Sequence, residues 1–383
     1  MRYISWEEFW WNNITGAHTV VDRVAMALLE NKMVILKVPS DLPWRYPMRS
    51  AIQSAFNERA DARDVVIETL DAVDNNPSNL EPGRFILQHY ASSAIKAGFR
   101  EKARIRIQDY ISDRNVIRNR IIWVKGLDEK SAGKWIQFCR GFSPRSATDG
   151  LFVLEVHGNI SSIESSHIQY IDFDDCVSSY DVQQFNSFIL DEQKQETINW
   201  KRYISTVTAA VCGVDAEVSE MLIQLTNFRI ETAIEGLRHV DSLGEFDRRG
   251  ADINSTHPLR HIRNNNFAEL QHRIWTAQIQ VLFPMIELER QSLTQKWNNA
   301  IKEALATQQI EQFGTILTDP AEAELGTLCY MMSCKVGSNR LLYIPEEQDR
   351  KRIRFLHNCR NKLAHMNCCT PDEVVGLLES PSL

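Results

Sequence analysis

Short and nearly unbroken apolar runs recur through the first half of the chain, and stretches with apolar residues three and four apart lie between them. A run of this kind is typical of a strand that is buried on both faces of a parallel sheet. The stretches between the runs have the spacing of amphipathic helices. Strands that alternate with helices favour an α/β domain with helices on both sides of the sheet. The predicted strands are 33–38, 65–70, 121–124, 151–156 and 168–172, and the predicted helices begin at Ser5 and cover 19–30, 49–58, 85–98 and 131–140.

After residue 175 the pattern becomes helical. The polar stretch 241–266 is predicted to be a linker because it contains Gly244, Gly250 and Pro258. Near the end, Thr370-Pro-Asp-Glu373 has the form of a capping box, which starts a helix. The predicted helices are 180–204, 205–225, 232–240, 267–306 with a kink at Pro284, one that starts at Asp319, 346–366 and 374–379, and a short strand is predicted at 341–344.

This pattern predicts three parts. An α/β domain covers residues 1–175, a helical lid or linker covers 176–255, and an all-α bundle covers 256–383. The length of 383 residues agrees with such a division, since one hydrophobic core rarely organises more than about 250–300 residues.

Composition narrows the class of protein. Hydrophobic residues make up 43% and charged residues 24%, which is typical of globular proteins and excludes collagen-like or disordered architectures. The net charge of -7 excludes a protein that coats nucleic acid, so a contact with RNA or DNA requires a local basic patch. Eight cysteines without paired spacing, no signal-peptide pattern and no apolar run of about 18 residues predict a reduced, cytoplasmic protein without a membrane segment.

The order of strands and helices over about residues 15–240 resembles the P-loop NTPases of the AAA+ and STAND kind. A phosphate-binding loop needs glycines whose N–H groups surround the phosphates, a Lys, and a Ser or Thr for Mg²⁺. The loop after the first predicted strand, 39–47, contains no glycine and three prolines, which lack N–H donors. The Gly133-Lys134 pair is followed by Trp135, and the third strand leads into Lys125 instead of an acidic pair. We therefore expect a pseudo-NTPase without cofactor or metal, with a doubly wound fold that never bound nucleotide as the alternative.

The C-terminal helix carries the sequence Arg360-Asn-Lys-Leu-Ala-His365. It resembles the R-x4–6-H signature of HEPN domains, with Arg360, Asn361 and His365 in the signature positions. At 100° per residue, Leu356, Cys359, Leu363 and Met366 form the apolar stripe, and His357, Asn361 and His365 lie on the opposite side.

The resemblance to HEPN ribonucleases implies a metal-independent RNA-cleaving site where two such faces meet in a dimer. His365 has the pKa range for proton transfer, Arg360 has the geometry to hold a phosphorane, and Asn361 can orient the imidazole. Two alternatives stay open: a HEPN-like bundle that only binds partners, and a chance match in an unrelated amphipathic helix.

Three further groups of residues are candidates for binding. Cys329 and Cys334, with Cys359, Cys368 and Cys369, have poor spacing for zinc and are interpreted as buried free thiols. Asp172, Asp174 and Asp175 follow a strand, where open α/β sheets bind ligands, although a helix cap explains them too. The candidates for nucleic-acid contact are Arg104, Arg106, Arg263 and Arg354.

The function predicted from these observations is a non-hydrolysing assembly or regulatory component of a prokaryotic anti-phage defence complex, an association that comes from the resemblances. Such a protein acts through contacts with further copies of itself or with other proteins of the system. Trp6, Trp10 and Trp11 and the polar face of the C-terminal helix are the expected contact surfaces. The alternatives are a HEPN ribonuclease and an adaptor that binds nucleic acid.

Overall fold

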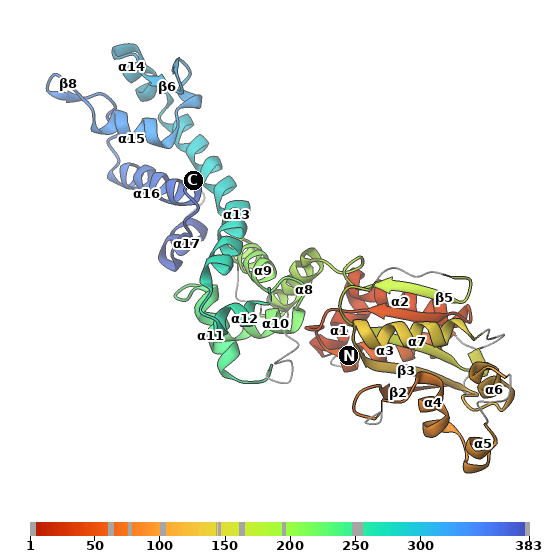
Figure 1. The fold of residues 1–383 in the computed structure, drawn as a ribbon. Helices are drawn as coiled ribbons and strands as arrows, with labels where there is room; N and C mark the ends of the chain where they lie inside the picture. The colour runs from red at the N-terminus through yellow and green to blue at the C-terminus, as the bar shows by residue number, and fades with distance from the viewer. Residues whose placement is uncertain are drawn as a thin grey trace. The chain divides into compact units, whose positions relative to one another are not determined.

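The computed structural model describes residues 5–59, 65–75, 79–99, 105–142, 144, 147–160, 165–193, 197–246 and 256–379. These residues form a five-stranded parallel sheet, two small hairpins and 17 α-helices (Figure 1). Contacts within the chain divide it into two compact units. The first unit contains residues 5–185 and 214–217, and the second contains residues 186–213, 218–246 and 256–379, so that the division falls inside α8 (Ser179–Glu192) and α10 (Ala216–Leu225).

The sheet of the first unit confirms the predicted α/β class. Its strands are all parallel and follow the order β2-β3-β4-β1-β5. Strand β1 pairs with the central strand β4 on one side, where Val34 lies opposite Val153, and with the edge strand β5 on the other, where Ile35 lies opposite Tyr170. The five strands lie where the apolar runs predict them: β1 (Met33–Lys37), β2 (Val66–Asp71), β3 (Arg120–Leu127), β4 (Leu151–Val156) and β5 (Ile168–Asp172).

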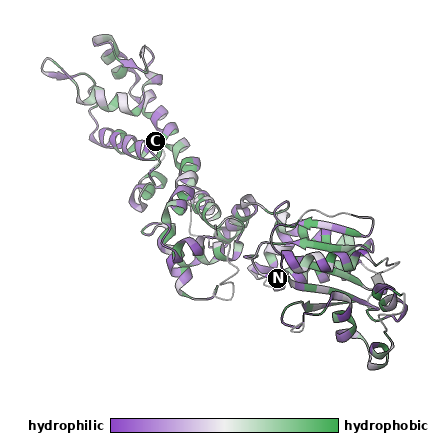
Figure 2. Ribbon diagram, viewed as in Figure 1, coloured by the Kyte–Doolittle hydropathy of each residue, from purple (hydrophilic) through white to green (hydrophobic). Residues whose placement is uncertain are grey.

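Continuous burial of β1 and β4 explains why their sequences do not alternate between apolar and polar residues. All six residues of β4 and the first four of β1 are buried, because helices cover both faces of the sheet. Figure 2 shows these strands as hydrophobic ribbons. Among the buried residues of these two strands, Glu155 is the one that carries a charge, and it has no exposed surface.

The first helix begins at the predicted cap, Ser5, whereas the helices predicted to start at residues 19, 49, 85 and 131 begin two to four residues earlier. In α1 (Trp6–Asn13) the Ser5 side chain accepts a hydrogen bond from the Glu8 N–H, and in α7 (Glu129–Arg140) Asp128 and Ser131 form a reciprocal capping box. The helix predicted over 85–98 is two helices, because the chain turns at Ala91 and Ser92 caps the second one. The remaining helices are α2 (Thr15–Leu29), α3 (Arg45–Arg59), α4 (Pro82–Tyr90), α5 (Ser93–Gly98) and α6 (Ile107–Asp113).

Trp10 and Trp11 lie in the core of the first unit, which corrects their predicted role as a contact surface, whereas Trp6 is half-buried. Trp10 and Trp11 have no exposed surface, and Trp6 and Trp10 pack edge-on against Phe185. The Trp11 indole also donates a hydrogen bond to the carbonyl of Trp44. An aromatic side chain buried in this way contributes to the unit's own stability and is absent from its surface.

The second unit is built from helices around α13 (Phe267–Lys296). This helix continues through Pro284, and the single helix predicted over 267–306 is divided at Trp297, before α14 (Asn298–Thr307). The predicted linker 241–266 contains a short helix, and its residues 247–255 lie outside the described chain. The other helices are α9 (Ile198–Cys212), α11 (Ala233–Ser242), α12 (Pro258–Arg263), α15 (Leu325–Ser333), α16 (Glu347–Ala364) and α17 (Pro371–Leu378). The three predicted domain boundaries stay a prediction.

Two hairpins flank α15 in the second unit (Figure 1). The first joins β6 (Glu311–Gln312) to β7 (Thr315–Ile316), and the second joins β8 (Lys335–Val336) to β9 (Asn339–Arg340). The strand predicted at 341–344 is wrong, because pairing stops at Arg340 and Leu341, Leu342 and Ile344 are buried side chains of an irregular segment. No helix among the described residues is long and apolar enough to span a bilayer.

Candidate functional site

The carboxyl ends of β1 and β4 form the crevice in which open α/β sheets commonly bind ligands. In this chain the crevice is occupied by the protein's own side chains. The β1–α3 loop starts at Val38 and ends at Trp44, and Arg45, the first residue of α3, folds back into it. Its guanidinium group donates to the carbonyl oxygens of Pro39 and Ser40 at 3.3 and 2.7 Å.

Glu155, near the end of β4, is the centre of this network. Arg49 makes two bonds with its carboxylate, at 3.2 and 2.7 Å, and Arg45 lies 3.4 Å from its other oxygen. The Trp123 indole on β3 donates a third hydrogen bond, at 2.7 Å. Each oxygen of this fully buried carboxylate is therefore matched by a donor, which is the condition for burying a charge.

Burial by itself raises the pKa of Glu155, but the charges of Arg49 and Arg45 outweigh burial and hold that pKa below its ordinary value. Glu155 is therefore ionised at neutral pH. The neighbouring ring of His157 has its Nδ1 3.1 Å from the Val38 carbonyl and its Nε2 3.4 Å from Arg45. A proton on Nδ1 satisfies both contacts, since Nε2 then accepts from the guanidinium group.

The geometry of the loop is opposite to that of a phosphate cradle. A phosphate is held by converging N–H groups, whereas this loop directs carbonyl oxygens at a guanidinium group. The N–H of Trp44, at the start of α3, donates to the carboxylate of Glu217 at 3.1 Å. The Gly133-Lys134 pair lies inside α7, and Lys134 forms an ion pair with Glu81.

On the same edge, Lys37 of β1 pairs with Asp172 of β5 at 2.7 Å. Burial and the nearby charge of Asp172 raise the pKa of Asp174. Among the described residues no three His, Cys, Asp or Glu side chains are placed to hold a metal ion. The predicted acidic group at this strand end is thus partly neutralised by a lysine that the sequence analysis did not assign to it.

The predicted HEPN-like residues lie on α16, in the second unit. Leu356, Cys359 and Leu363 are fully buried, as the stripe predicts, but Met366 is exposed. The helix ends at Ala364, and Met366 adopts a left-handed backbone with φ 59°, which turns its side chain away from the stripe. The Trp275 indole of α13 donates to the Leu363 carbonyl at 2.7 Å and so fixes this helix end.

The structure brings Arg360 and Asn361 together with partners that the sequence analysis missed. Arg360 forms an ion pair with Glu324 at 3.2 Å, and both side chains are about one-third exposed. Asn361 Nδ2 lies 3.0 Å from His357 Nε2, so its amide orients His357 and not His365. His365 is the exposed C-terminal cap of α16, and its own N–H donates to the Asn361 carbonyl. The spacing of four residues along a helix was a signal for the His357–Asn361 contact, whereas the Glu324 contact comes from another helix.

The predicted nucleic-acid contacts are divided between the two units, with Arg106 in the first and Arg263 and Arg354 in the second. Arg106 forms two 2.8 Å bonds with Asp109, and Arg263 forms a 2.7 Å bond with Asp241. Arg354 is exposed on α16. Arg104 lies outside the described residues. A phosphate would have to compete with the carboxylate that already pairs with such an arginine. Nucleic-acid contact at these residues stays a prediction.

All eight cysteines are free thiols. Of the five that were interpreted as buried, Cys359 and Cys369 are buried, whereas Cys329, Cys334 and Cys368 are only partly buried. Comparison of the chain with models of known protein families gives no matching family. Comparison with curated protein sequences also gives no match.

Proposed function

We propose that this protein is a non-hydrolysing, pseudo-NTPase component of a prokaryotic defence complex and that it acts through contacts with other protein chains. The observation that carries the first half of the proposal is Arg45, whose guanidinium group occupies the loop in which an NTPase binds phosphate. The order of the sheet supports an NTPase-like origin, because β1 lies between β4 and β5 and β2 is at the edge. This order resembles that of the AAA+ and STAND sheets.

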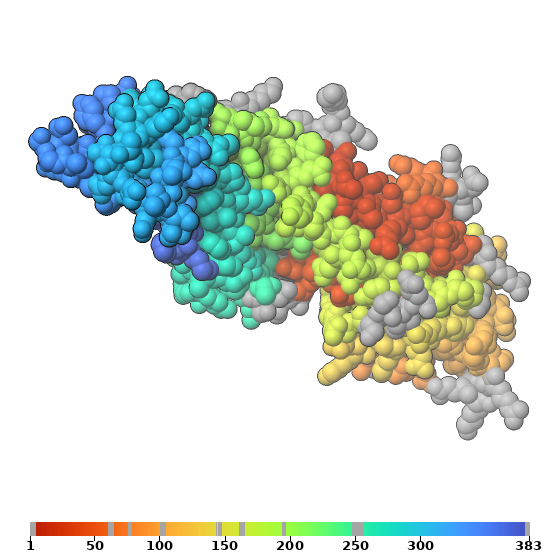
Figure 3. Space-filling model, turned by 90° about the horizontal axis from the view of Figure 1, so that it is seen from above, coloured from red at the N-terminus to blue at the C-terminus, as the bar shows by residue number. Residues whose placement is uncertain are grey.

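Exposed apolar side chains on the hairpin segment, which we define as residues 311–343, support the second half. Gln312 of the first hairpin binds the Thr327 hydroxyl and the Glu324 N–H, so the hairpin is attached to α15. Phe313 at its tip is 81% exposed. In the space-filling view of Figure 3 the late residues, in blue, form one end of the second unit. The other exposed large apolar or aromatic side chains of the hairpin segment are Ile316, Tyr330, Val336 and Tyr343. Exposed side chains of this kind are common in protein interfaces.

Nucleotide binding tests the first half. We expect no saturable binding of Mg·ATP in isothermal titration calorimetry up to millimolar nucleotide. Replacing Arg45 by Ala is expected to leave binding absent, because the loop would still lack glycines and the lysine. Binding of ATP to the native chain with a micromolar Kd would refute the pseudo-NTPase assignment.

Self-association tests the second half. We expect the native protein to form an oligomer in light-scattering-coupled gel filtration, and Phe313→Asp to dissociate it. Tyr46→Asp is the matched control, because Tyr46 is as exposed as Phe313 but lies in the first unit. A native monomer, or an equal effect of both substitutions, would count against the hairpin segment as a contact surface between copies.

One observation favours a ribonuclease as the second candidate. Arg360, Asn361, His357 and His365 place a guanidinium group, an amide and two imidazoles on the partly exposed surface at one helix end. These groups have the chemistry for proton transfer and for stabilising a phosphorane. If the candidate is right, the purified protein cleaves RNA in EDTA, and His365→Ala abolishes cleavage while the circular dichroism spectrum stays native. Unchanged cleavage in that variant would remove His365 from any catalytic role.

A further inference from the structure

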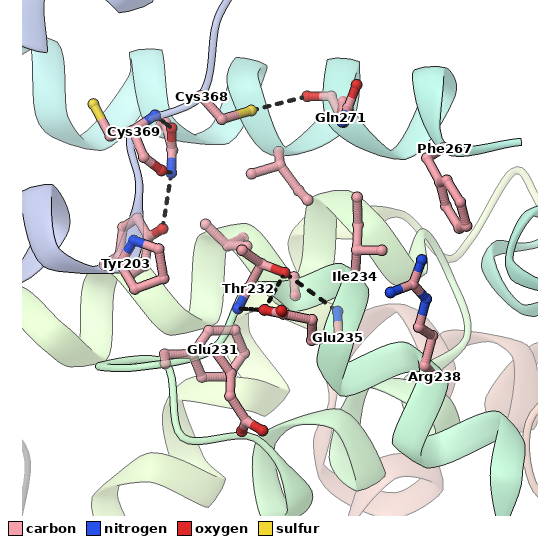
Figure 4. A pocket seen from close by; sticks show the side chains of 16 residues that line it. Tyr203, Glu231, Thr232, Ile234, Glu235, Arg238, Phe267, Gln271, Cys368 and Cys369 are labelled. Carbon is pink, nitrogen blue, oxygen red and sulfur yellow. Dashed lines mark hydrogen bonds between the residues drawn. The ribbon is translucent and has the colours of Figure 1, made fainter. Parts of the chain in front are cut away.

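A cavity of about 280 Å³ lies inside the second unit, at the junction of α9, α11, α13 and the segment before α17 (Figure 4). Its volume equals that of about nine molecules of liquid water, at about 30 Å³ each, and is close to the lower limit of small-molecule pockets. Seven of its sixteen lining residues have apolar side chains: Val207, Phe228, Ala233, Ile234, Phe267, Ile274 and Pro371.

The deep side of the cavity ends in a buried polar network. Gln278 is 2% exposed and donates hydrogen bonds to the Tyr203 hydroxyl at 3.0 Å and to the Cys369 carbonyl at 3.1 Å. Its own carbonyl accepts the Cys369 N–H at 2.7 Å. The Tyr203 hydroxyl thus accepts a bond, and its proton has no acceptor among the described residues. A buried hydroxyl with an unused donor is a specific anchor for an acceptor atom.

The charges at the other side of the cavity disfavour an anion. Glu231, Glu235 and Arg238 are the charged residues among those that line the cavity. Arg238 stacks over the ring of Phe267, with 4.8 Å between the guanidinium carbon and the ring centroid. Glu231 Oε2 accepts the Asn227 N–H at 3.0 Å, and Figure 4 shows this carboxylate turned away from the cavity. A ligand that donates a hydrogen bond fits beside the remaining carboxylate, that of Glu235, better than a ligand with a negative charge.

Glu235 has one oxygen left for a ligand. Its Oε2 accepts the N–H and the hydroxyl of Thr232, at 2.7 and 2.8 Å, in the capping box of α11. Its Oε1 accepts no hydrogen bond from the described part of the chain. Figure 4 shows Tyr203 and Arg238 on different sides of the cavity, with Thr232 and Glu235 between them. The Tyr203 hydroxyl can thus donate to a ligand and Glu235 Oε1 can accept from it, between apolar walls and an arginine–phenylalanine stack.

We propose that this cavity binds a small, uncharged, planar heteroaromatic molecule of nucleobase size, with an amino group that donates to Glu235 and a ring nitrogen that accepts from Tyr203. The apolar walls and the Phe267–Arg238 stack match the faces of such a ring. This site goes beyond the proposed assembly function and would make the second unit responsive to a small molecule.

2-Aminopurine tests the proposal directly, because its fluorescence falls when its ring stacks against a protein. We expect saturable quenching by the full chain with a Kd in the micromolar range. Purine, which lacks the amino group, is expected to compete at least five-fold more weakly, and benzoate, a planar anion of similar size, is expected not to compete. The proposal would be overturned if benzoate competed as well as purine, or if 2-aminopurine showed no quenching when protein was added up to 1 mM.

Two variants assign the contacts. Tyr203→Phe removes one donor and is expected to raise the Kd about five-fold, the effect of one ordinary hydrogen bond. Glu235→Gln keeps the capping box, which accepts either residue at this position, and is expected to raise the Kd by a similar factor. Tyr330→Phe is the matched control, because Tyr330 lies on α15 and outside the cavity. An unchanged Kd in both cavity variants would show that 2-aminopurine binds elsewhere and would refute the site.

Discussion

The charged groups in the crevice of the first unit are buried and paired, whereas those at the polar end of α16 in the second unit are partly exposed. In the crevice, Glu155 is fully buried and three side chains satisfy its carboxylate. On α16, Arg360 meets Glu324 at the surface, and His365 is exposed. The comparison teaches that a polar cluster at the expected place in a fold can serve stability in one unit and remain open for binding or chemistry in the other.

Replacing Glu155 by Ala is expected to have the largest effect. The substitution removes the buried acceptor that Arg49, Arg45 and the Trp123 N–H share, and it is expected to lower the free energy of unfolding by about 3–5 kcal/mol. Hydrogen exchange of the β4 amides, read by mass spectrometry, checks this. Glu68→Ala is the control, because its pair with Arg120 is more than one-third exposed and is worth less than about 1 kcal/mol. Equal protection of β4 in both variants would contradict a central role for Glu155.

In the second unit the large effect is expected from an apolar residue. Leu363 has no exposed surface, and its replacement by Ala is expected to cost about 2–5 kcal/mol. His365→Ala, two residues later, is expected to change stability by less than about 0.5 kcal/mol because its side chain is exposed. Hydrogen exchange of the α16 amides distinguishes the two. A strong loss of protection in His365→Ala would mean that this histidine supports the fold.

The pH dependence of stability sharpens the contrast. The pKa of Glu155 lies below its ordinary value of 4.5 in the folded chain. Its contribution is therefore complete above the ordinary pKa and is lost as pH falls through the lower, folded pKa. We expect the urea midpoint of the native chain, followed by tryptophan fluorescence, to fall more steeply between pH 5 and pH 3 than that of Glu155→Gln. Parallel curves for the two proteins would show that Glu155 does not carry this dependence.

The smallest effect is expected for the ion pair of Arg360 and Glu324. Both side chains are about one-third exposed, so solvent screens their attraction. A double-mutant cycle with Arg360→Ala and Glu324→Ala is expected to give a coupling free energy of less than about 1 kcal/mol in urea unfolding. A coupling free energy above about 2 kcal/mol would show that the pair stabilises the fold, as the Glu155 network is expected to do in the crevice.

Much of the fold could be predicted from local patterns. Five apolar runs marked all five strands of the sheet, and the capping residues Ser5 and Thr370 marked two helix starts. The positions at which helices end were harder to predict. α13 continues through Pro284, because packing along the whole helix outweighs the local effect of one proline, and the helix ends instead at Trp297. The prediction that Trp10 and Trp11 form a contact surface was wrong, because aromatic side chains are common both in interfaces and in cores.

The sequence by itself determined that the loop after β1 has no glycine, no Gly-Lys pair and three prolines, and hence no phosphate cradle. It also determined the composition of the α16 face, because residues three and four apart share a side of a helix. Only the tertiary structure decided what occupies the crevice. Arg45, Trp123 and Glu155 are 32 to 110 positions apart in the chain, and they meet because parallel pairing brings the ends of β3 and β4 beside the loop after β1. Contacts of this range follow from the order of the strands, which no local pattern contains.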